Sequence, residues 1–303
     1  MAISRAQLLK ELEPGLNAIF GDEYSQYENE DAPLFTTEKS NRAFEEEVLF
    51  PGFGAAAVKP EGQGVQYATT GEGWVARYTH ETVALAFAIT EEAVEDNLYD
   101  KLSSRLSKML ARSMAHTRQV KAANVYNNGF SASFLGGDGD ALCSTSHTLQ
   151  KTGSDLANRL NPDADLSETA LEAAIVEIAG WTDDAGIPTS LQVKSLHIPR
   201  NSVFIAERIL KSPYRVDTAN NDVNAIYNMG AVPGGYYVNH RFTDTDAWFL
   251  RTDAPNGMKH FVRKPISTKM EGDFETGNVR FKARERYVYG WSDWRGVYGS
   301  QGA

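Results

Sequence analysis

Residues 90–128 carry the pattern that most constrains the fold. Apolar side chains recur there at about every fourth position, a spacing that predicts one buried face of an α-helix. The predicted stripe consists of Val94, Leu98, Leu102, Leu106, Leu110 and Met114, widened by Tyr99 and Met109. Thr90 is a suitable N-cap residue, and Ile89 can pack on Val94 as a hydrophobic staple. A helix of this length spans roughly 55 Å, so the sequence predicts an elongated molecule built along it.

The end of the chain shows a second, different period. From Val279 onward, alternate residues separate into an apolar set and a cationic set, which predicts a β-strand with two unlike faces. The apolar set is Val279, Phe281, Ala283, Tyr287, Tyr289 and Trp291, and the cationic set is Arg280, Lys282, Arg284 and Arg286. Glu285 is the one charge on the apolar side. We expect the apolar face to pack on a core that includes the long helix. The basic face would either contact water or meet an acidic surface of another copy.

The first 88 residues divide into two segments with little capacity to bury themselves. Residues 1–43 are interpreted as an N-terminal arm, in which a short amphipathic pattern is interrupted by Pro14. The acidic stretch over 21–43 reads as an extended arm that a partner must order, and a partly disordered tail is the alternative. Residues 44–88 read as a glycine-rich extended β loop that ends in a long strand over 75–83. Such a loop either moves freely at the surface or lies on a neighbouring copy.

The remaining segments favour an α+β fold. A helix is expected over 167–181 and another over 202–210, with a strand over 196–199 between them. From residue 235 the chain reads mostly as β-strands. Runs of helices followed by runs of strands are typical of α+β proteins.

Composition excludes several classes of protein. The net charge of −10 argues against broad wrapping by nucleic acid. The chain has one cysteine, Cys143, so an intrachain disulfide cannot form and a reducing compartment fits. The sequence contains no apolar run long enough to span a membrane, and its N-terminus lacks the pattern of a secretory signal. We therefore expect an intracellular, soluble product.

The residues that usually carry chemistry do not form a recognisable site. Cys143 and His147 are four residues apart, but neither a metal-ligand spacing nor a nucleophile signature surrounds them. The loop around Gly136 lacks the Lys-Ser/Thr of a phosphate-binding loop. The prediction is that the protein is not an enzyme and has no catalytic residue, metal or cofactor. An enzyme or ligand-binding protein whose site is scattered through the sequence remains an alternative.

Four stretches of this chain resemble one protein family. The stretch over residues 71–119, which begins GEGWVARYTHETVALAFAITEEAV, is similar to an extended-loop strand that runs into a spine helix. ALCSTSHTLQKTG, LSETALEAAI and the closing FKARERYVYGWSDWRGVYGS resemble the segments that follow. These stretches resemble the major capsid proteins of tailed bacteriophages with the Hong Kong 97-type fold, and more closely the Mu-like major head subunit branch.

The resemblance implies a fold and a function. The fold would comprise an N-terminal arm (1–43), an extended β loop (44–88), a peripheral domain (89–150 and 251–303) with a spine helix over 90–128, and an axial domain (151–250). The protein would be a major capsid protein of the virion, assembled in the host cytoplasm. Its partners would be other copies in pentamers and hexamers, scaffold and portal proteins, and packaged double-stranded DNA bound without sequence specificity, with no membrane. Another phage structural subunit, from a tail or a decoration layer, is a further alternative.

The resemblance also suggests which residues meet other copies. Aromatic rings and arginines supply much of the energy at protein interfaces. The predicted assembly residues are Lys59, Trp74, Arg77, Arg284, Arg286, Trp291, Trp294 and Arg295. Lys59 is included because some members of the family crosslink a loop lysine to a neighbour.

Overall fold

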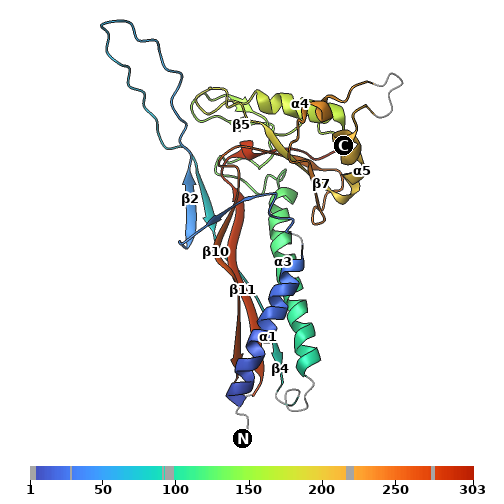
Figure 1. Ribbon diagram of the computed structural model, residues 1–303. Coiled ribbons are helices and arrows are strands. Elements are labelled where there is room, and N and C mark those ends of the chain that lie inside the picture. Colours follow the sequence, from blue (N-terminus) through green and yellow to red (C-terminus); the bar gives the residue numbers. More distant parts are fainter. Residues whose placement is uncertain (1–4, 28, 91, 93–98, 216–221, 274–276) are drawn as a thin grey trace.

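The computed structural model describes residues 5–27, 29–90, 92, 99–215, 222–273 and 277–303. Figure 1 shows an elongated molecule with a narrow stem, a broader upper domain at one end, and a loop that extends beyond both. The loop comprises residues 49–74 and is called the projecting loop below. Within the described residues, no helix is both long and apolar enough to cross a membrane.

The stem combines elements from both ends of the chain. Its elements are α1 (Arg5–Gln26), β1 (Thr36–Lys39), β4 (Glu81–Ile89), α3 (Tyr99–Asn127), β10 (Met258–Gly272) and β11 (Val279–Trp291). The strands form a sheet in the order β1-β10-β11-β4, in which only the β1 pairing is parallel. A separate hairpin of β2 (Phe44–Val48) and β3 (Val75–Thr79) supports the projecting loop.

The upper domain surrounds a second sheet with strand order β12-β9-β7-β8. Its strands are β7 (Val193–Pro199), β8 (Tyr236–Asn239), β9 (Trp248–Thr252) and β12 (Val297–Ser300). Its helices are α4 (Glu168–Ala179), α5 (Val203–Lys211) and α6 (Ala225–Met229), with short 3₁₀ turns at Arg200–Ser202 and Trp294–Gly296. A small hairpin, β5 (His147–Thr148) and β6 (Asp155–Leu156), lies beside them. The observed mixture of helices and sheets confirms the α+β prediction.

The two faces of β11 are arranged as its period predicts. Val279, Phe281 and Ala283 are buried, whereas the cations between them are exposed. Phe281 packs in one apolar cluster with Phe20 of α1 and Met114 of α3. The apolar face of the final long strand therefore packs on the long helix, as expected.

The long helix α3 differs from the prediction in its stripe. Its described part begins at Tyr99 and ends at Asn127, about 43 Å at the standard rise. Val94 and Leu98 lie outside the described residues. Met109 is 66% exposed, so its assignment to the buried stripe was wrong. The buried side of α3 instead includes small residues, Ala111, Ala115, Ala122 and Ala123. Small side chains let the helix approach its neighbours closely. The sequence prediction relied on large apolar residues and therefore did not include these alanines in the stripe.

The N-terminal segment packs on its own chain. The helix α1 continues through Pro14, and Leu16 and Phe20 are buried against α3 and β11. Beyond it, β1 pairs with β10, and Leu34 and Phe35 are buried. The expectation that residues 21–43 form an extended arm awaiting a partner was therefore wrong. The cause is long-range burial: the apolar surface that covers this segment comes from α3 and from the far end of the sequence.

The strand expected over residues 75–83 is two strands. β3 ends at Thr79, and β4 begins at Glu81 in a different sheet. His80, between them, is buried and its Nε2 lies 2.8 Å from the Ser40 hydroxyl. This break lets one continuous segment belong to both the hairpin and the stem.

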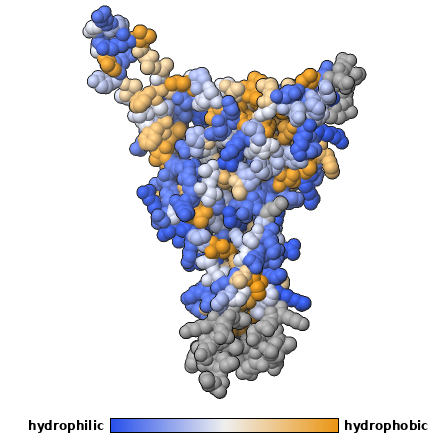
Figure 2. All heavy atoms as spheres, in the orientation of Figure 1, coloured by the Kyte–Doolittle hydropathy of each residue, from blue (hydrophilic) through white to orange (hydrophobic). Residues whose placement is uncertain are grey.

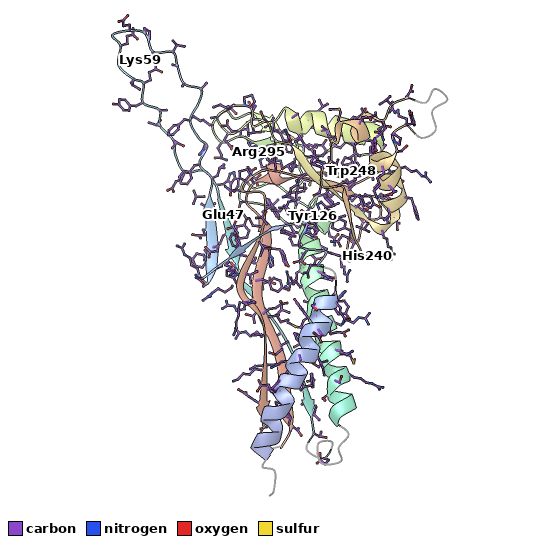
Figure 3. The ribbon with its side chains drawn as sticks, in the orientation of Figure 1. Glu47, Lys59, Tyr126, His240, Trp248 and Arg295 are labelled. Atoms are coloured by element: carbon purple, nitrogen blue, oxygen red, sulfur yellow. The ribbon has the colours of Figure 1, made fainter. Side chains whose placement is uncertain are left out.

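Tyr126 joins the stem to the upper domain (Figure 3). It is fully buried at the end of α3, and its hydroxyl donates to the Leu34 carbonyl at 3.0 Å. Its ring makes an edge contact with Phe249 of β9 at 5.1 Å between centroids. Arg251 adds a hydrogen bond to the Pro33 carbonyl. Contacts from three separate stretches of sequence thus hold the two parts together.

The last residues of the chain lie in the upper domain. β12 pairs with β9, and Trp294 and Tyr298 belong to the core cluster of the upper domain. The expectation that residues 251–303 stay together in the peripheral domain is therefore corrected for residues 294–300. The sharp turn after β11, through Ser292 and Asp293, redirects the chain there.

Candidate assembly interface

The projecting loop is the most exposed part of the molecule. From residue 53 to residue 72 every residue is exposed. In this described stretch, one backbone hydrogen bond forms, from the Gln63 amide to the Pro60 carbonyl. Lys59 lies near its far tip (Figure 3). Its large apolar side chains are Phe50, Phe53, Val58, Val65 and Tyr67, which are 57% to 97% exposed. Apolar groups exposed in this number commonly mark a surface that another molecule covers.

A polar clamp fixes the base of this loop. Lys259 of β10 is buried and forms ion pairs with Glu38 and Glu47, the latter at 3.3 Å. Glu47 also accepts a hydrogen bond from Ser292, which is bonded in turn to the Tyr78 hydroxyl. Burial acts to lower the pKa of Lys259, but the two carboxylates raise it above its usual value, so the ammonium stays charged. Because every member has a partner, the clamp holds the β2–β3 hairpin firmly on the stem.

Two tryptophans close this base by contact with glycine backbone. A Cβ atom at Gly137 would lie 2.5 Å from the Trp74 ring, and one at Gly136 would lie 2.8 Å from Nε1 of Trp291. Both rings are partly buried. A groove of about 260 Å³ runs between this glycine loop and β3. The structure thus places Trp74 and Trp291 at one site, although they are distant in sequence.

The remaining predicted arginines lie on different surfaces. Arg77 is exposed on β3, 3.7 Å from Glu46 and 4.1 Å over the Phe44 ring. Arg284 is exposed on the outer face of the stem sheet, and Arg286 beside it is partly buried. These residues are available to another molecule, but they do not form one cluster with Lys59.

Trp294 and Arg295 are buried within the subunit and were wrongly predicted to contact other copies. Each is 4% exposed. Trp294 stacks on His147 with 4.5 Å between ring centroids, and Arg295 donates to the Thr182 carbonyl at 3.0 Å. Their rings and charge hold the tail inside the upper domain. The sequence alone does not distinguish an aromatic tail that packs into the core from one that faces another molecule.

The upper domain also carries exposed large apolar side chains, which the sequence analysis missed. Figure 2 shows apolar residues gathered on this domain as well as on the projecting loop. The residues are Phe204, Ile205, Tyr214, Val223, Tyr227, Met229 and Tyr237, which are 42% to 78% exposed. On α5 the sequence does contain a signal for this exposure. Two large apolar residues, Phe204 and Ile205, directly precede the buried Ala206, and adjacent positions of a helix cannot all face the core.

A polar group near the glycine loop also escaped sequence reasoning. Ligand atoms of Asp138, Asp140 and His147 lie within 4.8 Å of one another, a spacing that could hold a metal ion. His147 is already engaged: its Nδ1 lies 2.7 Å from Asp138, and its Nε2 lies 3.0 Å from the Asn158 side-chain oxygen. Burial raises the pKa of Asp140. In the structure these groups hold the glycine loop against the upper domain.

Comparison with protein families gives one match. Residues 74–300 match the model of a family described as phage capsid protein. A search of curated proteins found no match.

Solved structures with the same fold are shells or particles. The capsid of cyanophage P-SCSP1u has a TM-score of 0.56 and 11% identity, covering 89% of this chain and 86% of that chain. The capsid of a native GTA particle has a TM-score of 0.54 and 13% identity, covering 91% and 92%. A virus-like particle from Pyrococcus furiosus has a TM-score of 0.50 and 10% identity, covering 94% and 97%. At these identities the likeness concerns the fold.

Proposed function

Because the chain belongs to the phage capsid protein family, we propose that it is the major capsid protein of a tailed phage and assembles into an icosahedral shell. The observation that carries this function is the family match over residues 74–300, which covers the upper domain and the stem elements that follow the projecting loop. The family is one of structural proteins, which supports a role without catalysis, and it places the protein in the virion.

The finer features of the proposal concern how copies meet. The shell consists of pentamers and hexamers, assembles in the host cytoplasm with a scaffold and a portal, and encloses double-stranded DNA. The upper domain is the axial domain and the stem is the peripheral domain. Within the family, the proposal assigns the chain to the Mu-like branch, which its closing block FKARERYVYGWSDWRGVYGS resembles.

The projecting loop is the proposed assembly arm, together with Trp74, Arg77 and Trp291 at its base. Its exposed rings lack contacts within the subunit that would bury them. Burial against a neighbour removes that apolar area from water, at about 25 cal/mol per Å². Repeated over every copy, such contacts sum to a stable shell although each is weak. Lys59 lies where a covalent crosslink to a neighbour would be accessible.

Deletion of residues 55–72, with the ends rejoined by a short Gly-Ser turn, tests this function. The removed residues contribute no buried side chain, so the thermal unfolding of the unassembled chain should stay the same. Negative-stain microscopy should show shells tens of nanometres across for the natural sequence and none for the deletion. Small oligomers from both chains would contradict the capsid function. Normal shells from the deleted chain would contradict the role of the loop alone.

A further inference from the structure

The face of the stem sheet that points away from α1 and α3 is strongly cationic. Residues paired across antiparallel strands share one face of a sheet, so β10 and β11 contribute to this surface together. Its cations are Lys264, Lys269, Arg280, Lys282, Arg284 and Arg286, and they define the basic sheet face. All are exposed except Arg286, which is partly buried. A chain with a net charge of −10 thus concentrates positive charge on one flat surface.

The subunit itself leaves much of this charge uncompensated. Lys282 lies directly opposite Lys269, and Arg286 lies directly opposite Lys264. Like charges at such positions destabilise a sheet. Acidic partners occur at one end only, where Glu271 pairs with Lys269 and Asp273 pairs with Arg280. Among the described residues, the other four cations form no ion pair. An anionic partner would remove this repulsion.

The shape of the face favours a polyanion over a folded protein. On the edge strand β4, the neighbours of Arg280, Lys282 and Arg284 are Ala88, Ala86 and Ala84. These alanines are exposed, so a rod can reach this part of the face, whereas the β2–β3 hairpin covers the face further up, at Val288 and Gly290. Protein interfaces usually centre on large aromatic or apolar anchors, and the face presents none. Attraction to a line of phosphates needs no such anchor.

From these observations we propose that the basic sheet face binds the phosphate backbone of double-stranded DNA without reading its sequence. Alternate side chains along a strand lie about 6.8 Å apart, so Arg280 to Arg286 covers roughly 20 Å. A duplex carries one negative charge per about 1.7 Å of its axis, so any register along this row meets phosphates. The identification of the polyanion as DNA rests on the proposed capsid function. The excess of positive charge on this face is a feature of the structure and does not depend on that function. The face would then point toward the interior of the shell.

The test measures duplex binding by the full-length, unassembled chain. A fluorescent, mixed-sequence duplex of about 24 bp is titrated with protein between about 50 and 200 mM salt, and affinity is read by anisotropy. The variant is Lys269→Gln/Lys282→Gln/Arg284→Gln. The matched control is Arg105→Gln/Lys108→Gln/Arg112→Gln on the exposed side of α3, which removes the same charge.

The natural chain should bind the duplex, and the sheet variant should bind roughly tenfold or more weakly at low salt. The slope of log affinity against log salt should fall by about 2 to 3, or about 0.9 per lost phosphate contact. The melting temperature of the sheet variant should hold or rise, because repulsion between Lys269 and Lys282 is gone. The α3 variant should change both slope and affinity less.

Three outcomes would overturn the proposal. The sheet variant binds the duplex as the natural chain does; the α3 variant loses as much affinity; or polyglutamate of equal charge binds more tightly than the duplex, which would indicate an acidic protein partner. Shell formation is scored separately by microscopy. Suppose that the natural chain and the sheet variant both form shells, and that only the sheet variant loses duplex binding. This result would support both the capsid function and the DNA-binding face. Absence of shells from the natural chain counts against the capsid function alone.

Discussion

Glu285 is a buried carboxylate on the otherwise apolar face of β11. It is 3% exposed, and its Oε1 atom has no hydrogen-bond partner. Burial raises its pKa from 4.5 to about 7, against the opposing effect of the Arg118 guanidinium on α3. Asp31 raises the pKa further, while Tyr24 of α1 lowers it. The neutral acid is therefore the form that fits between α1 and the sheet.

Replacement of Glu285 by Gln should stabilise the subunit at alkaline pH only. Because the folded pKa is raised, the native chain holds this proton more tightly than the unfolded chain, so stability falls as pH rises from 4.5 through 7. A neutral amide avoids that loss, which is up to about 3 kcal/mol for a shift of this size. Urea unfolding of the unassembled chain at about pH 4 and about pH 8.5 measures it. The exposed substitution Glu61→Gln is the control, and an equal effect of Glu285→Gln at both pH values would contradict the explanation.

At the scale of elements, α1 depends on a few apolar contacts with the far end of the chain. Phe20 is 4% exposed, stacks on Tyr24 at 5.9 Å and meets the Phe281 ring at 6.5 Å. The Leu16 carbonyl accepts a hydrogen bond from Ser107 of α3 at 3.1 Å. The helix is also held by the Lys108–Glu23 ion pair at 3.6 Å and by a hydrogen bond from Thr268 to the Asn17 side chain at 2.6 Å. Because α1 is not a strand of the stem sheet, it should be able to detach without unfolding the sheet.

Phe20→Ala should therefore loosen α1 selectively. Removing a buried phenylalanine costs about 3 to 5 kcal/mol, and here the cost falls mainly on the docking of one helix. Hydrogen exchange of α1 amides should accelerate strongly, while the amides of β11 keep their protection. Ser25→Ala, at an exposed position of the same helix, should change neither. Uniform acceleration throughout the stem would show that α1 and the sheet unfold as one unit.

The contrast between β11 and α1 shows what the sequence could reveal. The faces of β11 follow from alternation between adjacent residues, a local signal that held from Val279 to Tyr287 and not over the last four residues of the strand. The position of α1 depends on Phe281, which is remote in the sequence, and no local period encodes such a contact. The prediction that Trp294 contacts other copies was wrong for a related reason, because a turn after β11 directs this residue into the core of the upper domain. A short-range period in the sequence predicts the two faces of a helix or strand. Which face is buried, and against which element, depends on tertiary contacts.

At the scale of the whole molecule, the subunit combines a rigid base with an unsupported loop. The clamp around Lys259 and Glu47 fixes the direction of the loop, and the loop itself forms almost no contacts. The family and the α+β fold were recognisable from sequence blocks. The assembly residues were only partly predictable, because ring content does not separate Trp291 at the base of the loop from Trp294 in the core.

Polar substitution of the loop rings should separate folding from assembly. Phe50→Ser/Phe53→Ser/Tyr67→Ser removes side chains that are 57% to 97% exposed, so the unfolding free energy should change by no more than about 0.5 kcal/mol per site. Light scattering should show that shells require a much higher protein concentration, or do not form. The control Gln63→Ser/Gln66→Ser alters the same loop without loss of rings. Equal shell assembly by the two variants would show that the three aromatic rings do not contribute to the assembly interface.

The position of β12 has a consequence for biosynthesis. The core of the upper domain includes Trp294 and Tyr298, and the Asn158 side chain donates to the Trp294 and Val297 carbonyls. A nascent polypeptide that has not yet reached residue 294 lacks these groups and leaves one edge of β9 unpaired, while the other edge pairs with β7. The core of the upper domain therefore cannot close until residues 294–298 have been translated.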